Sequence, residues 1–253
     1  MKLCGFVLAA GLGTRIRPLF PDLPKPLVPV GGRPAIAWSM DLLARAGVSR
    51  IVVNVHHRRE MMRAVLPGLA PPGVELLISE EETLLGTGGG IANARELFSG
   101  FDWLLVVNAD ILTSLSLRPL WRRALREESE AHLILSPRGP KSEQGRIGRA
   151  SSGDLWLAPP RGEGDGSPRA IPPGVRPGVF LGVQMVRPEI FRGVDPAKAP
   201  SVIDLYRERI AAGGRMRASF TESFWVDLGT EDGYLRGRRY LEGEEDPAPP
   251  AEG

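Results

Sequence analysis

The sequence has one cysteine and no long apolar run, and both absences restrict what the protein can be. Cys4 has no partner for an internal disulfide. It lies in an apolar stretch, so we expect it to pack in the core of a protein kept in a reducing compartment. No apolar run reaches the length of a transmembrane helix, and the N-terminal residues lack the pattern of a signal peptide. We therefore expect a cytoplasmic protein that does not insert into a membrane.

A strong excess of one charge is also missing. The chain has 32 basic and 30 acidic residues, which give a formal net charge of +2. No broad polycationic surface is available for nucleic acid, so we predict that the protein does not bind it. The pI of about 8.9 is better explained by a local phosphate site. With 253 residues, of which 42% are hydrophobic, the chain can bury a large core as a single domain.

Two common nucleotide-binding motifs are absent from the glycine-rich stretch near the N-terminus. The apolar run from Leu3 to Ala9 predicts a buried strand, and the segment AGLGTR, residues 10–15, follows it. A P-loop needs a lysine after its glycines at a spacing that this stretch does not have. The dinucleotide fingerprint needs a third glycine at the position of Ile16.

The same stretch nevertheless has the parts of a polyphosphate site. Gly11 and Gly13 permit a tight turn and a close approach of the backbone to a ligand. Consecutive backbone N–H groups in such a turn form a nest for an anion. Arg15 adds a planar fork of donors, and Lys25 adds a compact charge. Prolines on both sides of Lys25 stiffen the segment that presents it.

The first 135 residues alternate between strand and helix patterns. This alternation predicts an α/β fold with a doubly wound, mostly parallel sheet and right-handed crossovers. The expected strands are Leu3–Ala9, Arg50–Val55, Val74–Ile78, Trp103–Val107 and Ala131–Leu135. The expected helices run from Ile36 to a stop at Gly47, from His57 to Leu66, from Ile91 to Phe98, and from Leu117 to Glu128 with Ser116 as a cap.

The pattern changes after residue 135. Ser136–Gly178 is rich in Gly, Pro, Ser and Arg and predicts a small β-rich insertion with hairpins that forms one wall of an acceptor pocket. A disordered loop over Pro159–Pro173 is the alternative. The expected later elements are strands at Val179–Val186, Met216–Phe220 and Ser223–Val226, and helices at Val202–Ala212 and from a Thr230 cap to about Leu241. Residues 243–253 are expected to form a disordered tail.

Two aspartates are candidate ligands for a hard cation at the edge of this sheet. Ligands of open parallel sheets bind beyond the carboxyl ends of the strands, where the glycine turn, the Ser79–Gly90 loop and Asp110 all lie. Mg²⁺ prefers one or two carboxylates together with phosphate oxygens and water. Asp110 and Asp227 suit this role, although an Asx turn at the first and a helix cap at the second are the structural alternatives. Thr230 is better placed to cap, which leaves Asp227 free.

Several ordered blocks resemble the sugar-1-phosphate nucleotidyltransferases. The blocks are GLGTR (11–15), PKPLVPV (24–30), LGTGGGI (85–91), VVNADIL (106–112), FLGV (180–183) and WVDLGT (225–230). The resemblance implies a Rossmann-like fold, with a nucleotide-binding half at 1–135 and a sugar-phosphate half at 136–242 in one domain. It implies a Mg²⁺-dependent enzyme whose partners are an NTP and a sugar-1-phosphate, either as a monomer or as a homo-oligomer.

The resemblance also assigns roles to individual residues. The implied nucleotide contacts are Ala10, Gly11, Gly13, Thr14, Arg15, Lys25, Glu81 and Gly86. The implied sugar contacts are Gly88, Gly89 and Gly182. Arg15, Lys25 and Asp110 would be catalytic, with Lys25 stabilising charge on the transferred phosphoryl group. Asp110 and Asp227 would hold Mg²⁺.

The chain departs from the family pattern at two places, and its base specificity stays open. Ala109 stands where the family usually has glycine, and the Glu-Lys-Pro segment that grips sugar phosphate is missing between Gly139 and Gly178. The pattern is similar to N-acetylmuramate-1-phosphate uridylyltransferases and to mannose- or heptose-1-phosphate guanylyltransferases. An inward carboxylate at Glu81 would favour guanine, whereas uracil could be bound by backbone groups. A non-catalytic homologue is the rival, but Arg15, Lys25 and both aspartates are all retained.

Overall fold

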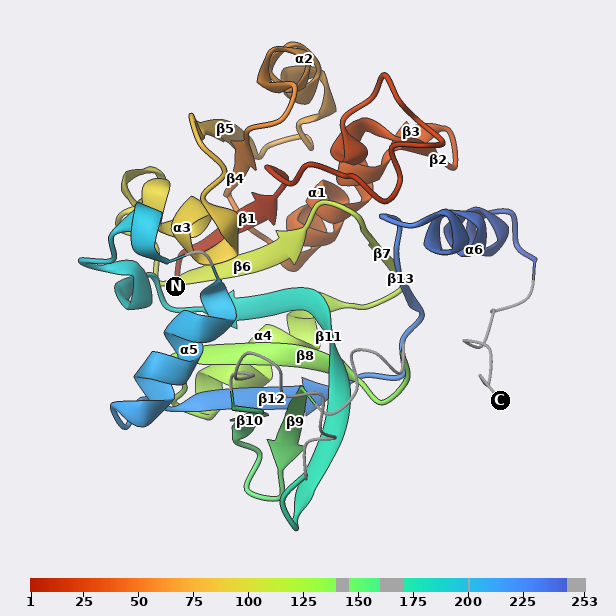
Figure 1. Ribbon diagram of the computed structural model, residues 1–253. Helices are drawn as coiled ribbons and strands as arrows, with labels where there is room; N and C mark the ends of the chain where they lie inside the picture. The colour runs from red at the N-terminus through yellow and green to blue at the C-terminus, as the bar shows by residue number, and fades with distance from the viewer. Residues whose placement is uncertain (140–145, 160–170, 200, 245–253) are drawn as a thin grey trace, which may run out of the picture.

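A mixed sheet runs through the molecule, and helices cover both of its faces (Figure 1). The computed structural model describes residues 1–139, 146–159, 171–199 and 201–244. Within these residues the main sheet has nine strands. The doubly wound α/β architecture expected from the sequence is therefore confirmed.

One half of the sheet is parallel. Its strands are β1 (Leu3–Leu8), β4 (Arg50–Val55), β5 (Glu75–Glu80) and β6 (Trp103–Asn108), in the order β6-β1-β4-β5. Helices α1 (Ala35–Ala46), α2 (Arg59–Val65) and α3 (Gly86–Asn93) connect them. Because all four strands run in the same direction, their carboxyl ends meet at one rim of the sheet.

The other half is organised around one long antiparallel strand. Strand β11 (Val175–Val186) lies between β6 and β8 (Ala131–Ser136), and β12 (Met216–Phe220) is parallel to β8. Gly182 has a φ of 72°, and the pairing of β11 with β8 shifts register between Phe180 and Gln184. The bend allows the first part of β11 to pair with β9 (Ile147–Ala150), which forms a hairpin with β10 (Leu155–Leu157). The expected hairpin is thus present.

Successive side chains of the central strands pack alternately into two separate hydrophobic cores. Leu3 and Val7 of β1 pack on the side of α1 and α4 (Leu117–Arg126), whereas Cys4 and Phe6 pack on the other side. Helices α3 and α5 (Val202–Ala211) cover that second side. This alternation is what a strand buried on both faces requires, because successive side chains point to opposite faces.

The remaining elements lie outside the main sheet. Short strands β7 (Ile111–Thr113) and β13 (Trp225–Asp227) pair with each other, as do β2 (Pro29–Val30) and β3 (Arg33–Pro34). The last helix is α6 (Glu231–Leu241). The 3-10 turns are Lys25–Leu27, Leu66–Leu69, Arg95–Phe98, Pro188–Phe191 and Pro196–Lys198. Most of the expected loop at Pro159–Pro173 and of the expected tail lies outside the described residues.

Three helix boundaries show where local signals held and where they did not. Gly47 ends α1 with a φ of 94°, and Thr230 caps α6 by accepting from Gly233 N–H at 3.1 Å, as expected. Ser116 precedes α4 but makes no side-chain cap, so that expectation was wrong. Pro119 is the third residue of α4 and lacks the N–H that such a cap commonly uses.

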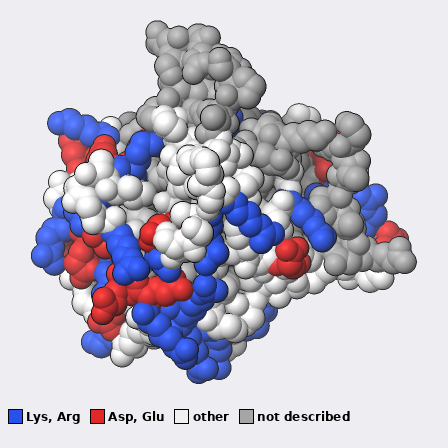
Figure 2. Space-filling model, turned by 90° about the horizontal axis from the view of Figure 1, so that it is seen from below, with Lys and Arg blue, Asp and Glu red and all other residues white. Residues whose placement is uncertain are grey.

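The surface away from the rim carries charged side chains of both signs. On the face seen in Figure 2, basic and acidic side chains lie interspersed. Pairs such as Arg209–Glu130 at 2.7 Å and Arg217–Glu127 at 3.2 Å join different elements.

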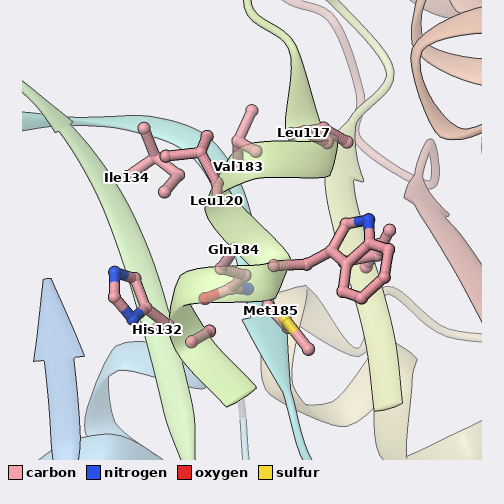
Figure 3. A pocket seen from close by; sticks show the side chains of 10 residues that line it. Leu117, Leu120, His132, Ile134, Val183, Gln184 and Met185 are labelled. Carbon is pink, nitrogen blue, oxygen red and sulfur yellow. The ribbon is translucent and has the colours of Figure 1, made fainter. Parts of the chain in front are cut away.

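A mostly apolar cavity lies between α4 and strands β6, β8 and β11, with His132 and Gln184 as polar side chains in its wall (Figure 3). Within the described residues, no helix is both long and apolar enough to cross a bilayer.

Candidate active site

Two aspartates meet at the rim because two short strands pair across more than a hundred residues of sequence. Asp110 lies two residues after the end of β6 and directly before β7, and Asp227 ends β13. The antiparallel register of β7 with β13 places Asp227 opposite Ile111, next to Asp110. Leu228 N–H also donates to the Asp110 carbonyl at 2.8 Å. The backbone therefore fixes the distance between the two carboxylates before any ligand arrives.

Lys25 joins the two aspartates. Its ammonium forms an ion pair with Asp110 Oδ2, and its Nζ lies 3.6 Å from Asp227 Oδ1. The side chains of Lys25 and Asp110 are mostly buried, at 18% and 10% exposure. Pro24 and Pro26, which are both buried, hold the 3-10 turn that carries Lys25. The two prolines restrict the backbone on both sides of the lysine.

Arg15 approaches Asp227 from the solvent side. Its Nη2 donates to Asp227 Oδ2 at 3.3 Å, and its side chain is 62% exposed. Asp227 Oδ1 also accepts from Gly229 N–H at 2.7 Å, which orients the carboxylate. Two cations and two carboxylates therefore converge on one rim, as the sequence predicted.

The glycine turn packs over Lys25 and leaves open space beside it. Gly13 has a φ of 62°, and a Cβ on this residue would lie 2.7 Å from the Lys25 Cβ, so glycine is required there. A Cβ on Gly11 would meet no described atom within 4 Å. Ala10 is buried, whereas Thr14 is exposed. The turn thus has a packed side toward Lys25 and an open side where a phosphate would fit.

The burial of Lys25 weakens its hold on its proton. Burial lowers the pKa of Lys25, and the positive charge of Arg15 lowers it further, while the carboxylate of Asp227 opposes both effects. Because burial destabilises the charged form of Lys25, any additional negative charge that approaches the ammonium stabilises it. A polyphosphate is such a group.

The donor set suits a hard divalent cation that arrives with phosphate. Asp110 and Asp227 offer carboxylate oxygens at one rim, held by backbone pairing and by Gly229. Among the described residues, no cluster of three or more His, Cys, Asp or Glu could hold a metal on its own. Two carboxylates with open positions for phosphate oxygens and water match the preference of Mg²⁺.

Glu81 lies in a network of hydrogen bonds rather than in open space. It is 1% exposed. Its Oε1 accepts from Asn54 Nδ2 at 2.7 Å, and its Oε2 accepts from Leu85 N–H at 3.0 Å. Asn54 in turn accepts from Ala9 N–H at 2.8 Å. Both carboxylate oxygens are therefore engaged by the protein in this structure.

The other glycines assigned from the sequence lie at close contacts. Gly86 begins α3, which starts five residues earlier than the expected Ile91. A Cβ on Gly88 would lie 2.6 Å from the Ala199 carbonyl, so the buried glycines of α3 let the helix pack closely against the segment after Pro196. A Cβ on Gly182 would lie 2.5 Å from Asn108 Nδ2 at the end of β6. Sugar contacts for Gly88, Gly89 and Gly182 stay predictions.

Two residues of the rim were missed from the sequence. Asn54 is the penultimate residue of an apolar strand on the same edge as Asp110, and the rule that led to Asp110 would have found it. Arg58 has a left-handed φ of 51° and donates to the carbonyls of Asp22 at 2.7 Å and Pro21 at 3.0 Å. It thereby ties the loop before Lys25 to the start of α2. No sequence signal distinguishes it from its arginine neighbour.

Comparison with known proteins agrees with this geometry. The family model for nucleotidyl transferases matches residues 4–155. The chain is 33% identical to N-acetylmuramate alpha-1-phosphate uridylyltransferase of Neisseria meningitidis serogroup B over 227 residues, which are 88% of this chain and 92% of that protein. It is 27% identical to a probable mannose-1-phosphate guanylyltransferase of Oryza sativa subsp. japonica, over 96% of this chain and 66% of that protein.

Among solved structures, the inositol-1-phosphate CTP transferase of T. maritima has the same fold. The TM-score is 0.74 at 17% identity, with 96% of each chain covered. The order of motifs, the rim and the match over most of the chain lead to one assignment. The chain belongs to the nucleotidyl transferase family and is an enzyme of its sugar-1-phosphate nucleotidyltransferase group.

Proposed function

We propose that this enzyme joins UTP to N-acetylmuramate α-1-phosphate and releases pyrophosphate. The relative from Neisseria meningitidis, named for this substrate pair, aligns over nearly its whole length. The mannose-1-phosphate guanylyltransferase aligns over only 66% of its length. This difference favours the uridylyl reaction over the alternative, which is GTP with mannose- or heptose-1-phosphate. The convergence of Arg15, Lys25, Asp110 and Asp227 is the observation that carries the proposal.

The proposed reaction is an in-line displacement at the α-phosphorus of the NTP. An oxygen of the sugar phosphate forms the new P–O bond, the bond to the β-phosphate oxygen breaks, and pyrophosphate leaves with that electron pair. Such a transfer asks for little covalent chemistry from the protein, so positioning and charge stabilisation supply most of the rate.

Each side chain of the rim has a role in this scheme. The glycine turn binds the triphosphate through its backbone N–H groups, and Arg15 stabilises the charge that develops on pyrophosphate. Lys25 is held close to the rim by Asp110, and it stabilises the pentavalent centre. Asp110 and Asp227 would hold Mg²⁺, which screens negative charge on the phosphates.

The two halves of the domain divide most of the substrate contacts in this proposal, although Gly88 and Gly89 of the first half lie on the sugar side. Residues 1–135 carry the glycine turn, Lys25 and Asp110, and they bind the nucleotide. Residues 136–242 contribute Asp227, Gly182 and the β9–β10 hairpin to the sugar-phosphate side. Since the Glu-Lys-Pro segment is missing, another group of this half has to bind the sugar phosphate.

A pyrophosphate-release assay with a panel of substrates tests the proposal. UTP, GTP, dTTP, CTP and ATP would each be combined with N-acetylmuramate, N-acetylglucosamine, mannose and glucose 1-phosphates in the presence of Mg²⁺. We expect the highest kcat/KM with UTP and N-acetylmuramate 1-phosphate. Preference for GTP and mannose 1-phosphate would refute the substrate assignment, and no release with any pair would favour a non-catalytic nucleotide-binding homologue.

A further inference from the structure

A chain of buried hydrogen bonds connects the two loops that are proposed to bind the nucleotide. Asn54, at the end of β4, accepts from Ala9 N–H at 2.8 Å and donates to Glu81 Oε1 at 2.7 Å. Glu81 Oε2 then accepts from Leu85 N–H, one residue before α3, at 3.0 Å. These hydrogen bonds therefore link Ala9, the residue just before the glycine turn, through the end of β4 to the N-terminus of α3.

Both side chains of this pair are closed off from solvent. Asn54 and Glu81 are each 1% exposed. His56 adds support by donating from Nδ1 to the Glu81 carbonyl at 3.0 Å, and Glu81 N–H donates to the Val55 carbonyl at 2.9 Å. A buried carboxylate is costly unless its oxygens accept hydrogen bonds, and here both oxygens do so.

The direction of the hydrogen bonds makes a carboxylate necessary. Ala9 N–H can only donate, so it fixes the Asn54 oxygen toward the turn and the Asn54 amide nitrogen toward Glu81. Leu85 N–H can also only donate. Glu81 therefore has to accept at both ends. A glutamine at this position has one acceptor oxygen and would turn its NH₂ group against one of the two donors.

Helix α3 packs directly on the pair. A Cβ on Gly90 would lie 2.5 Å from Glu81 Oε1 and 2.6 Å from Asn54 Nδ2. Glycine inside a helix is destabilising relative to alanine. At this position the missing Cβ is what allows the helix to approach Asn54 and Glu81. The pair thus contacts three elements of the rim at once.

We propose that Asn54 and Glu81 are positioning residues that hold the phosphate-binding turn and the base-binding loop in register. The inference rests on the proposed nucleotide transfer and deepens it. Glu81 acts through the backbone of Leu85 and through Asn54, and the nucleobase is bound by backbone groups of the loop before α3. Loss of either residue therefore weakens the binding of every NTP by the same factor. A shift of one loop relative to the other misplaces the triphosphate, whichever base the nucleotide carries.

The first test is made without any ligand. Hydrogen exchange of Glu81→Gln is compared with the wild-type chain and with Glu82→Gln, the same chemical change at an exposed neighbour. We expect faster exchange in Glu81→Gln both around Leu85 and around Ala9, which lies more than seventy residues away in sequence. Unchanged exchange around Ala9 would overturn the proposal, and so would an equal response in Glu82→Gln. Asn54→Ala gives an independent measurement if Glu81→Gln does not fold.

The second test measures equilibrium binding of UTP and GTP with Mg²⁺. We expect about tenfold weaker binding of both nucleotides in Glu81→Gln and in Asn54→Ala, with an unchanged ratio of the two affinities. The double variant should bind nucleotide no more weakly than the single variant with the lower affinity. Both substitutions break the same series of hydrogen bonds, so their effects on affinity should not add. A changed UTP-to-GTP ratio in Glu81→Gln, with wild-type binding in Asn54→Ala, would show that Glu81 contacts the base directly. A wild-type chain that binds no NTP refutes the proposed function, while the ligand-free exchange test still decides the role of the pair.

Discussion

Replacing Lys25 by methionine should have two opposite effects, one on metal binding and one on turnover. Methionine keeps most of the length and apolar body of the side chain and removes the ammonium between Asp110 and Asp227. The two carboxylates then lose their internal cation. We expect the ligand-free variant to bind a free divalent cation more tightly than the wild-type enzyme, although it turns over more slowly.

The size of the metal effect can be worked from the structure. At the 3.6 Å between Lys25 Nζ and Asp227 Oδ1, an effective dielectric of about 20 gives a gross Coulomb energy of about 4.6 kcal/mol. Asp227 is 38% exposed, so solvent screens much of this energy. If about a third of it is regained by an added cation, binding improves roughly tenfold. Turnover should fall about 10²–10³-fold, as when one preorganised charge is removed from an active site.

The assay is Mn²⁺ binding followed by electron paramagnetic resonance in the absence of nucleotide. Lys198→Met is the matched control, because Lys198 is 84% exposed and, among the described residues, forms a local ion pair with Asp195. Folding of each variant is checked by circular dichroism. A folded Lys25→Met that binds Mn²⁺ no more tightly than the control would refute the placement of Lys25 between the metal-binding carboxylates. Wild-type turnover in the same variant would refute its catalytic role.

Two further predictions concern stability and reactivity. Burial lowers the pKa of His132 from 6.5 to about 4, helped by Arg123, Arg217 and Arg149 and opposed by Glu127. As the pH falls, His132 therefore takes up a proton in the unfolded chain before it does so in the folded protein. The free energy of unfolding is highest above about pH 6.5 and declines toward pH 4, with a loss of about 2 kcal/mol by about pH 5. Urea unfolding should show this slope in the wild type and a flatter one in His132→Gln; equal slopes would contradict it. Burial also raises the pKa of the Cys4 thiol to about 12, so Ellman's reagent should label Cys4 only after denaturation, and rapid labelling of the native protein would contradict the packing of β1.

The fold was largely predictable because its main signals are local. The apolar runs of β1, β4 and β6 and the stop at Gly47 gave strand and helix bounds within a few residues. The helix α3 was misplaced because four of its first five residues are glycine and have low helix propensity. Its start is set by the carboxylate of Glu81 and by packing against distant residues, neither of which a local pattern contains.

The parts of the site that come soon after a strand could be predicted from the sequence. The parts that depend on contacts between residues far apart in the sequence were missed. Asp110 and the glycine turn come within two residues of the ends of parallel strands, so the rule of parallel sheets placed them on one rim. The short strand β7 was not expected, because its three residues pair with Trp225–Asp227, which lie far along the chain and are not visible in a local pattern. The closed network around Glu81 also depends on Asn54 in a different strand. The sequence therefore suggested a free carboxylate where the structure has an engaged one.

The most direct test of the account compares the wild-type enzyme with Asp110→Asn in single-turnover release of pyrophosphate from UTP. Both proteins are supplied with Mg²⁺ and saturating N-acetylmuramate 1-phosphate, and their folding is compared by thermal unfolding. Asparagine keeps the shape of the side chain and removes the charge that faces Lys25. We predict a folded variant whose rate is about 10²–10³-fold lower than that of the wild type. A folded Asp110→Asn with the wild-type rate would contradict the claim that the charges converging on this rim carry out the transfer.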